Sequence, residues 1–301
     1  MSLPIAPGPA PALRAGFRGA AAGLSSRPGP ARAIAAIAAH LAAAIVVAAA
    51  AERLRAASWV VWIAMLPAVW LFIGSRFRAL GNMMHECCHR TLVRGKRASR
   101  GFGHFLSFFD FTDFVDYAME HLSHHRHLGD PERDRDFAAR RALFDRLGPL
   151  GPRYLAFSLT LRHLPLYIRP VVWCRRDGRW LAAARAAFLA ALVGLGAVAG
   201  WDVLALYYLV PYLTAYQIFR FWSDAADHAG LMTGATEFDR ARNHGLGWAP
   251  LDWLVFPRHD QYHLVHHLFP AIPTRRLPEM HARLLAAPAY AARTHRLGAR
   301  S

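Results

Sequence analysis

The chain has 301 residues, of which 54% are hydrophobic, with three cysteines and a formal net charge of +16. So few cysteines argue against a disulfide framework, and the high apolar content is unusual for a strongly basic soluble domain. The positive charge is arginine in loops beside apolar runs, which favours anionic membrane lipid over nucleic acid as a partner.

Residues 1–30 are rich in Ala, Gly and Pro, with scattered Arg and no periodicity. This composition predicts a disordered, basic N-terminal tail. The apolar run that follows begins too far from the N-terminus to belong to an ordinary cleaved signal peptide. Residues 31–290 are expected to form one membrane domain, followed by a C-terminal tail over residues 291–301.

Two uncharged runs, residues 33–51 and 56–75, come first. At about 1.5 Å per residue, a helix of either run can cross most or all of a ~30 Å hydrocarbon layer. The charges between the runs fall within residues 52–55, which predicts a helical hairpin with its turn there. A soluble bundle of buried helices is the alternative, and uncharged stretches of this length disfavour it.

A second helical hairpin is predicted over residues 186–219, where Asp202 is the only full charge and Gly200 begins the turn. Each arm is short for a membrane span, so Arg185 and Arg220 are expected to reach outward to polar surroundings. The expected fold class is an all-α integral membrane protein. Four transmembrane helices form two hairpins, and a histidine-rich helical cap lies on the cytoplasmic side.

Basic residues beside the hairpins set this orientation, because basic loops stay on the cytoplasmic side of a membrane. They follow the first hairpin and precede the second: Arg76, Arg78, Arg90, Arg94, Lys96, Arg97 and Arg100, then Arg162, Arg169, Arg175, Arg176 and Arg179. Residues 76–185 and 220–301 are therefore expected at the cytoplasmic face of a multi-pass protein, in a bacterial inner membrane.

Three histidine clusters fall within those two segments. The first is HECCH, in which His85 and His89 stand four residues apart. The other two have the form HxxHH, and their members are His121, His124 and His125, then His263, His266 and His267. Positions i, i+3 and i+4 share one face of a helix, so each cluster presents its imidazoles to one point.

Imidazole is a good ligand for Fe, Zn, Cu or Ni, and eight imidazoles are too many for one ion. Many nitrogen ligands with few carboxylates favour two metals, as a redox-active iron pair. HECCH also matches the HExxH motif of zinc proteases, in which Glu86 would be the general base. That alternative predicts one or two further ligands, not two HxxHH clusters. Other histidines are expected to be ordinary surface or core residues: His40, His104, His163, His281 and His295.

The clusters resemble the boxes HxxxH, HxxHH and HxxHH of the membrane fatty acid desaturase and hydroxylase superfamily. The similarity covers roughly residues 60–285. YHLVHHLFPAIP, from Tyr262 to Pro273, is similar to the third box of acyl-lipid desaturases. HLSHHRHLGDPERD with HECCH is similar to bacterial and sphingolipid-type desaturases. Residues 31–290 would then be the desaturase domain.

In that superfamily the box histidines hold two iron ions on the cytoplasmic side, beside an acyl tunnel. The resemblance implies that all eight box histidines are iron ligands. It also implies one more ligand after the fourth span, here His228, with a polar residue one turn earlier, here Asp224. Asp224 is thus a candidate ligand of iron or of a water on iron, although Asn is common at such a position. Glu86 is expected to orient an imidazole, and Cys87 and Cys88 to be packing residues.

The resemblance implies an O2-dependent desaturase that introduces a double bond into a lipid acyl chain. A lipid hydroxylase or a carotenoid- or sphingoid-type oxygenase of the same superfamily is the alternative, because both reactions use the same ligands. We find no GxGxxG fingerprint, CxxC pair or haem module in the sequence, so a separate ferredoxin-like or cytochrome-like electron donor is expected. The basic loops suit docking of an acidic carrier, contact with anionic lipid, or both.

Overall fold

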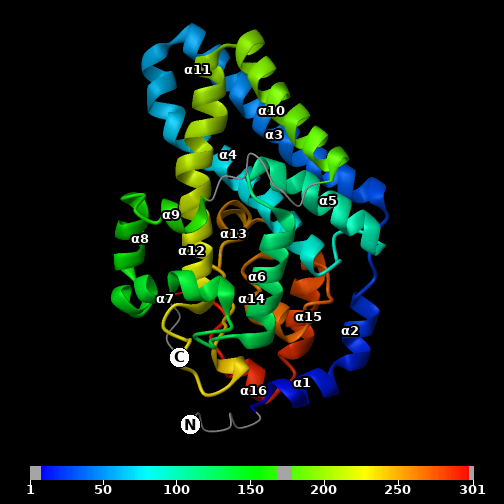
Figure 1. Ribbon diagram of the computed structural model, residues 1–301. Coiled ribbons are helices and arrows are strands. Elements are labelled where there is room, and N and C mark those ends of the chain that lie inside the picture. The colour runs from blue at the N-terminus through cyan, green and yellow to red at the C-terminus, as the bar shows by residue number, and fades with distance from the viewer. Residues whose placement is uncertain (1–7, 169–177, 298–301) are drawn as a thin grey trace.

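The computed structural model describes residues 8–168 and 178–297, which are helical or loop. Cys174 and three arginines used for the orientation, Arg169, Arg175 and Arg176, lie outside the described residues. The all-helical class is confirmed for the part of the chain that the structure describes. In Figure 1, α3, α4, α10 and α11 extend to one end of the molecule, and shorter helices gather at the other end.

The long helices are α3 (Pro30–Ala57), α4 (Trp59–Cys88) and α10 (Arg179–Ala199). A fourth helical run consists of α11 (Trp201–Leu204), the π-helical η1 (Ala205–Leu209) and η2 (Tyr212–Tyr216), and α12 (Gln217–His228). The shorter helices before the second pair are α1 (Ala10–Gly16), α2 (Arg18–Leu24), α5 (Lys96–Phe109), α6 (Phe114–His127), α7 (Arg135–Leu147), α8 (Pro152–Leu159) and α9 (Leu164–Tyr167). The last ones are η3 (Glu237–Asp239), α13 (Ala249–Val255), η4 (Pro257–His259), α14 (His263–Leu268), η5 (Thr274–Arg276), α15 (Leu277–Leu284) and α16 (Pro288–Ala291).

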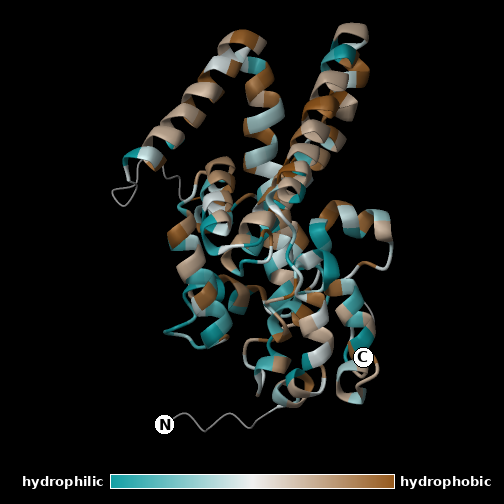
Figure 2. Cartoon of the chain, turned by 90° about the vertical axis from the view of Figure 1, so that its right-hand side faces the viewer, coloured by the Kyte–Doolittle hydropathy of each residue, from teal (hydrophilic) through white to brown (hydrophobic). Residues whose placement is uncertain are grey.

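Three helices of the described ranges, α3, α4 and α10, are long and apolar enough to cross a membrane. Their outer faces expose large apolar side chains, such as Ile45 at 68% and Val198 at 90%. Figure 2 shows the apolar colouring concentrated at this end of the molecule. Because hydrocarbon removes the cost of exposing such faces, they indicate membrane association. The run from α11 to α12 contains π-helical turns and is therefore not one continuous α-helix of membrane-spanning length. A fourth span there stays a prediction.

The turn between α3 and α4 lies at Ser58, where the backbone is extended and the hydroxyl accepts a hydrogen bond from Val61 N. The turn predicted at residues 52–55 is therefore wrong, because α3 continues through these charges. A charged side chain within residues 52–55 has its partner on the neighbouring run that begins with α11. Arg55 lies 2.7 Å from a carboxylate oxygen of Asp202.

Arg185 and Arg220 do not reach outward as expected. Arg185 is buried, 4.0 Å from Asp113, and Arg220 lies 3.1 Å from Asp110. Both carboxylates stand in or next to the connection between α5 and α6. The two arginines therefore hold this connection, and α6 after it, against the long helices. The expectation was wrong because it gave these charges no partner inside the protein.

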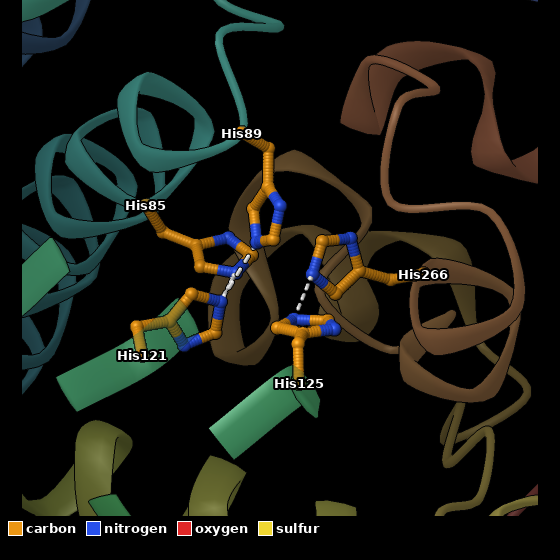
Figure 3. A group of neighbouring side chains, drawn as sticks. All are labelled: His85, His89, His121, His125 and His266. Atoms are coloured by element: carbon orange, nitrogen blue, oxygen red, sulfur yellow. Dashed lines mark hydrogen bonds between the residues drawn. The ribbon is translucent and has the colours of Figure 1, made fainter. Parts of the chain in front are cut away.

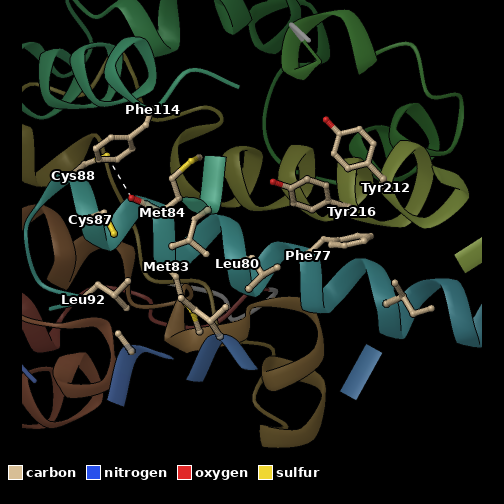
Figure 4. Packing of buried hydrophobic residues seen from close by; sticks show 14 of the residues in the cluster. Phe77, Leu80, Met83, Met84, Cys87, Cys88, Leu92, Phe114, Tyr212 and Tyr216 are labelled. Atoms are coloured by element: carbon tan, nitrogen blue, oxygen red, sulfur yellow. Dashed lines mark hydrogen bonds between the residues drawn. The ribbon is translucent and has the colours of Figure 1, made fainter. Parts of the chain in front are cut away.

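Helix α4 lies at the centre of the largest apolar cluster, part of which Figure 4 shows. Cys87 and Cys88 belong to this cluster, as predicted. Gly74 allows α4 to approach η2 closely, because a Cβ at this position would lie 2.6 Å from Cβ of Ala215 and 2.7 Å from the backbone nitrogen of Tyr216. This packing fixes the first histidine box relative to the helix that ends at His228.

The segment expected to be a disordered tail contains two ordered helices, α1 and α2. Leu13 and Leu24 are buried in a cluster with residues of α14 and α15. The guanidinium of Arg14 donates to the carbonyl of Leu268 at 3.1 Å and contacts Glu237 at 2.5 Å. Composition alone missed these helices because contacts with distant residues stabilise them.

The expected C-terminal tail also contacts the rest of the protein. The backbone nitrogen of Leu297 donates to the carbonyl of Gly245 at 2.9 Å. The ring of His295 stacks against that of Tyr290, with centroids 4.6 Å apart. Residues 291–297 therefore pack against the loop that precedes the third histidine box.

Candidate metal centre

Four elements bring the histidine clusters together. The first box closes α4, the second closes α6, and His228 is the last residue of α12. The third box is the helix α14 itself. Three helices thus end at the centre, and the negative end of a helix dipole favours a cation. Asp113 fixes the start of α6, where its carboxylate accepts hydrogen bonds from the backbone nitrogens of Val115 and Asp116.

Nine imidazoles form two groups, in each of which the potential ligand atoms lie within 4.8 Å of one another. The first group has five members: His85, His89, His121, His125 and His266. Figure 3 shows these five rings pointing toward one another. The Nε2 atom of His121 lies 2.8 Å from Nε2 of both His85 and His89, and Nε2 of His266 lies 3.0 Å from that of His125.

The second group has four members: His124, His228, His263 and His267. Nε2 of His228 lies 3.1 Å from Nε2 of His124 and 2.9 Å from that of His263. Nε2 of His267 lies 3.0 Å from that of His263. His124, His228 and His267 are buried.

The crowding of these nitrogens fits a metal at each group. Nitrogens bound at about 2.1 Å and at right angles around one ion lie about 3 Å apart, which is the spacing found here. Burial, and then the neighbouring imidazoles of His124 and His228, lower the pKa of His267 well below its usual value. A neutral imidazole has a free lone pair, and this is the form that binds a metal.

Carboxylates and a carbonyl hold the far nitrogen of several rings. Nδ1 of His124 lies 2.9 Å from the carboxylate of Asp134, and Nδ1 of His263 lies 3.3 Å from that of Asp227. Nδ1 of His228 donates to the carbonyl of Arg240 at 2.8 Å. The hydrogen-bond partners of His124 and His228 place the proton on Nδ1 and leave Nε2 free to bind a metal.

The surroundings of Asp134 favour the charged form of its carboxylate. Its burial works against the charge, but the hydrogen bond and charge of His124, with hydrogen bonds from the backbone nitrogens of Gly129 and Phe137, lower the pKa. A negative charge next to Nδ1 of His124 makes its opposite nitrogen, Nε2, a stronger electron-pair donor to a metal cation.

Four side chains around the two imidazole groups were missed from the sequence. They are Asp134, Asp136, Asp227 and His244. His244 is fully buried, and its Nε2 lies 2.7 Å from Asp227. Asp134 stands within the HLSHHRHLGDPERD motif and Asp227 directly precedes His228, so a search for carboxylates near the boxes would have found both. The sequence gives no such signal for His244.

Asp224 and Glu86, the other predicted site residues, lie outside both imidazole groups. The carboxylate of Asp224 pairs with Arg140, which also binds Asp136. Glu86 was expected to orient an imidazole, but its carboxylate accepts a hydrogen bond from Nε of Arg258 at 2.8 Å. Glu86 therefore ties the first box to the segment that precedes the third box.

A cavity of about 370 Å³ adjoins both groups. His85, His121, His124, His228 and His263 line it. Polar and charged side chains dominate the rest of its wall, among them the ion pair of Arg78 with Asp260, at 2.6 Å. Phe137, Phe144, Leu166 and Met119 supply the apolar part of the wall. A substrate in this cavity would lie next to both imidazole groups.

The helix α4, long and apolar enough to cross a membrane, leads into two clusters of imidazoles that could hold metal ions, and this combination indicates a membrane-associated protein with a candidate metal centre. The fatty acid desaturase family model matches residues 57–298, and the chain belongs to that family. It is 30% identical over 261 residues to an omega-3 fatty acid desaturase, chloroplastic, of Glycine max. This alignment covers 74% of this chain and 54% of the relative.

Two further relatives are similar at lower identity. The dihydrorhizobitoxine desaturase of Bradyrhizobium elkanii is 26% identical, over 69% of this chain and 64% of the relative. The sn-2 acyl-lipid omega-3 desaturase (ferredoxin), chloroplastic, of Helianthus annuus is 26% identical, over 78% of this chain and 58% of the relative. The chain thus spans between half and two thirds of the length of these curated relatives.

Proposed function

We propose that the protein is a diiron, O2-dependent desaturase that introduces a double bond into a fatty acyl chain. The observation that carries the proposal is the division of nine imidazoles into groups of five and four. Membership of the fatty acid desaturase family supports it, as do the names of the relatives. The eight box histidines and His228 are the proposed iron ligands.

Two iron ions held there would supply the O2-dependent chemistry that breaks unactivated C–H bonds. The acyl chain loses two hydrogen atoms and gains a double bond. O2 takes up these two hydrogens with two external electrons and two protons, and two water molecules form.

The protein's own contribution is to hold the ligands in one geometry. Asp134 and the carbonyl of Arg240 keep the protons of His124 and His228 on Nδ1, so the opposite nitrogens would be free to bind the metals. The cavity beside the imidazoles would hold the reacting part of the acyl chain, and its apolar side would exclude water from it.

The proposed topology has four spans in two hairpins, α3 with α4 and α10 with the run through residues 201–219. The cap would then lie on the cytoplasmic side of a bacterial inner membrane, as the distribution of arginines suggests. Two exposed tryptophans support a membrane interface there. The ring of Trp253 lies 6.1 Å from that of Phe72 in α4, and Trp248 precedes the same helix α13.

The electron donor would be a small ferredoxin-like or cytochrome-like protein. The name of the Helianthus annuus relative specifies ferredoxin. A chain with a formal net charge of +16 suits an acidic carrier, because complementary charge accelerates docking.

Expression in a bacterial host, together with a ferredoxin and its reductase, tests the proposal. The fatty acid profile should gain an unsaturated acid that is absent from cells expressing His267→Ala. An unchanged profile from a protein loaded with two irons would contradict acyl desaturation, and the position of a new double bond would define the regiochemistry.

The polar wall of the cavity favours a second candidate, an oxygenase acting on a lipid whose polar group lies close to the reacting carbon. Carboxylates and arginines both line this cavity, among them Asp113, Asp116 and Arg78. A sphingoid base has this character, whereas the middle of a fatty acyl chain does not. Hydroxylated lipid in place of a new alkene would favour this candidate.

A further inference from the structure

A second cavity, of about 590 Å³, lies on the other side of the segment that leads into the third histidine box. Asp260 and His263 of this segment line the cavity beside the imidazole groups. The neighbouring Arg258, His259, Gln261 and Tyr262 line the second cavity instead. The segment therefore separates two cavities, and only the first is accounted for by the proposed chemistry.

The wall of the second cavity is basic. Arg258, Arg275 and Arg296 line it together with four histidines, and Asp252 is the one acidic side chain among the described residues of the wall. The carboxylate of Asp252 already accepts a hydrogen bond from the backbone nitrogen of Leu246, at 2.7 Å.

Two of these arginines keep an unbalanced charge. Arg258 is paired with Glu86, but no described carboxylate pairs with Arg275 or Arg296. The guanidinium of Arg275 donates to the carbonyl of Ser26 at 3.3 Å. Burial is the main cause that lowers the pKa of Arg275, and the positive charges of Arg32 and Arg276 lower it further.

Two buried polar side chains in this wall lack hydrogen-bond partners. They are the hydroxyl of Thr274 and the amide oxygen of Gln261, on residues that are 6% and 8% exposed. A buried polar group without a partner costs about 1–3 kcal/mol, so a ligand that supplies one stabilises the site. Thr274 can donate its hydroxyl proton, and rotation of the Gln261 amide presents its NH2 group instead of its oxygen.

The mouth of the cavity lies beside residues suited to a membrane interface. Trp253 lines the cavity, half of its surface is exposed, and its ring stacks on the guanidinium of Arg76 at 3.7 Å. Trp248, at the start of α13, is 63% exposed. Ser75 of α4 donates to the carbonyl of Leu254 at 2.5 Å, which fixes α13 where the apolar part of α4 ends. Tryptophan prefers this level of a bilayer, where lipid phosphates also lie.

We propose that this second cavity binds a phosphate group through Arg275, Arg296 and Thr274. An anionic phospholipid headgroup and free phosphate share the required chemistry, namely negative charge and several strong acceptor oxygens. The position beside Trp253 favours the headgroup. This site is independent of the proposed desaturation, because it rests on residues outside both imidazole groups.

The test is a binding titration of the detergent-solubilised full chain with its metals bound. One arm adds phosphatidylglycerol and the other adds inorganic phosphate, and native mass spectrometry counts the bound molecules. Arg275→Gln/Arg296→Gln should bind phosphatidylglycerol at least tenfold more weakly than the wild type. The matched control is Arg276→Gln/Arg283→Gln, which removes the same charge from two arginines that pair with Glu279. It should bind much more tightly than Arg275→Gln/Arg296→Gln, because Glu279 already pairs with both removed charges.

Thr274→Val provides a second variant that changes no charge and little volume. It should weaken binding severalfold, with unchanged metal content and melting temperature. Binding of phosphatidylglycerol alone, dependent on the two arginines, would identify a lipid headgroup site, and similar dependence for inorganic phosphate would identify free phosphate as the ligand. If the wild type binds neither probe, or if Arg275→Gln/Arg296→Gln binds both like the wild type, the proposal is wrong.

Discussion

The carboxylate of Asp134 contacts both the Nδ1 atom of His124 and the backbone at the start of α7. Its oxygens are 2.9 and 3.0 Å from Nδ1 of His124, and they also accept hydrogen bonds from the backbone nitrogens of Gly129 and Phe137. The second set of bonds begins α7 and fixes the loop after the second box. The orientation of the imidazole is thereby tied to the start of a helix that contributes no ligand.

We expect Asp134→Asn to weaken metal binding at the group of four imidazoles by roughly tenfold to 100-fold, because the charge behind His124 is lost. Asn keeps an oxygen that can still cap α7, so the fold should be retained. Iron per chain, measured after dialysis against a graded series of chelator concentrations, checks the effect.

Asp130→Asn is the matched control, because the carboxylate of Asp130 accepts hydrogen bonds from the backbone nitrogens of Glu132 and Arg133 in the same loop and binds none of the nine clustered imidazoles. Its iron content should equal that of the wild type. Equal retention of iron by both variants would show that Asp134 does not support a ligand.

The second prediction concerns the division of the ligands into two groups. The wild type should hold two irons per chain, and His228→Ala should retain about one, because the group of five imidazoles keeps all its members. Metal analysis of the purified variant gives this ratio directly. His127→Ala changes a histidine outside both groups and should keep both irons. Complete loss of metal from His228→Ala would mean that the two groups bind cooperatively as one site.

Asp224→Asn should retain its iron. The carboxylate of Asp224 is engaged by Arg140, whereas the nine imidazoles already complete both groups. We expect a decrease of about 1 kcal/mol in the free energy of unfolding from the weakened ion pair, since Arg140 keeps Asp136 as a partner. Thermal melting and metal analysis test the two statements separately. A loss of iron would make Asp224 a ligand.

We predict that His163 contributes to the stability of the fold, although it belongs to neither imidazole group. Its ring is fully buried and stacks on Phe221, with centroids 4.9 Å apart. His163→Ala would leave a cavity, and we expect it to lower the free energy of unfolding by about 2 kcal/mol. Iron bound per folded chain should not change. His163→Phe, which keeps the aromatic packing, should recover most of the loss, and a failure to do so would assign the effect to the imidazole nitrogens.

Spacing within the sequence was sufficient to predict which histidines gather, because a box of three imidazoles on one helical turn is a local feature. The eight box histidines and His228 all lie in the two groups, and their role as iron ligands stays a prediction. The sequence could not divide them into five and four, because His266 joins the first box while its neighbour His267 joins His228. That division depends on how α14 is oriented between α6 and α12.

The parts of the fold that sequence analysis missed depend on distant partners. Arg185 is buried against Asp113, and Arg14 reaches the carbonyl of Leu268. Neither contact leaves a trace in local composition or periodicity. The same holds for Glu86, whose partner Arg258 is 172 residues away along the chain. Charge and hydropathy predicted where these residues stand in sequence, but not which side chains they meet.

The π-helical turns before His228 make the length of that helix critical. Tyr208, Tyr212 and Tyr216 form a row of neighbouring rings, with centroids 6.3 and 5.8 Å apart. Four residues of α-helix overshoot a full turn by about 40°, so a regular helix would gradually rotate such a row around its axis. The wider π-helical turns on either side of Pro211 offset this rotation. A deletion of one residue within 205–216 would preserve the hydropathy of the segment, yet it would turn His228 by about 100° away from His124. Insertions and deletions here should therefore be far less tolerated than substitutions between apolar residues.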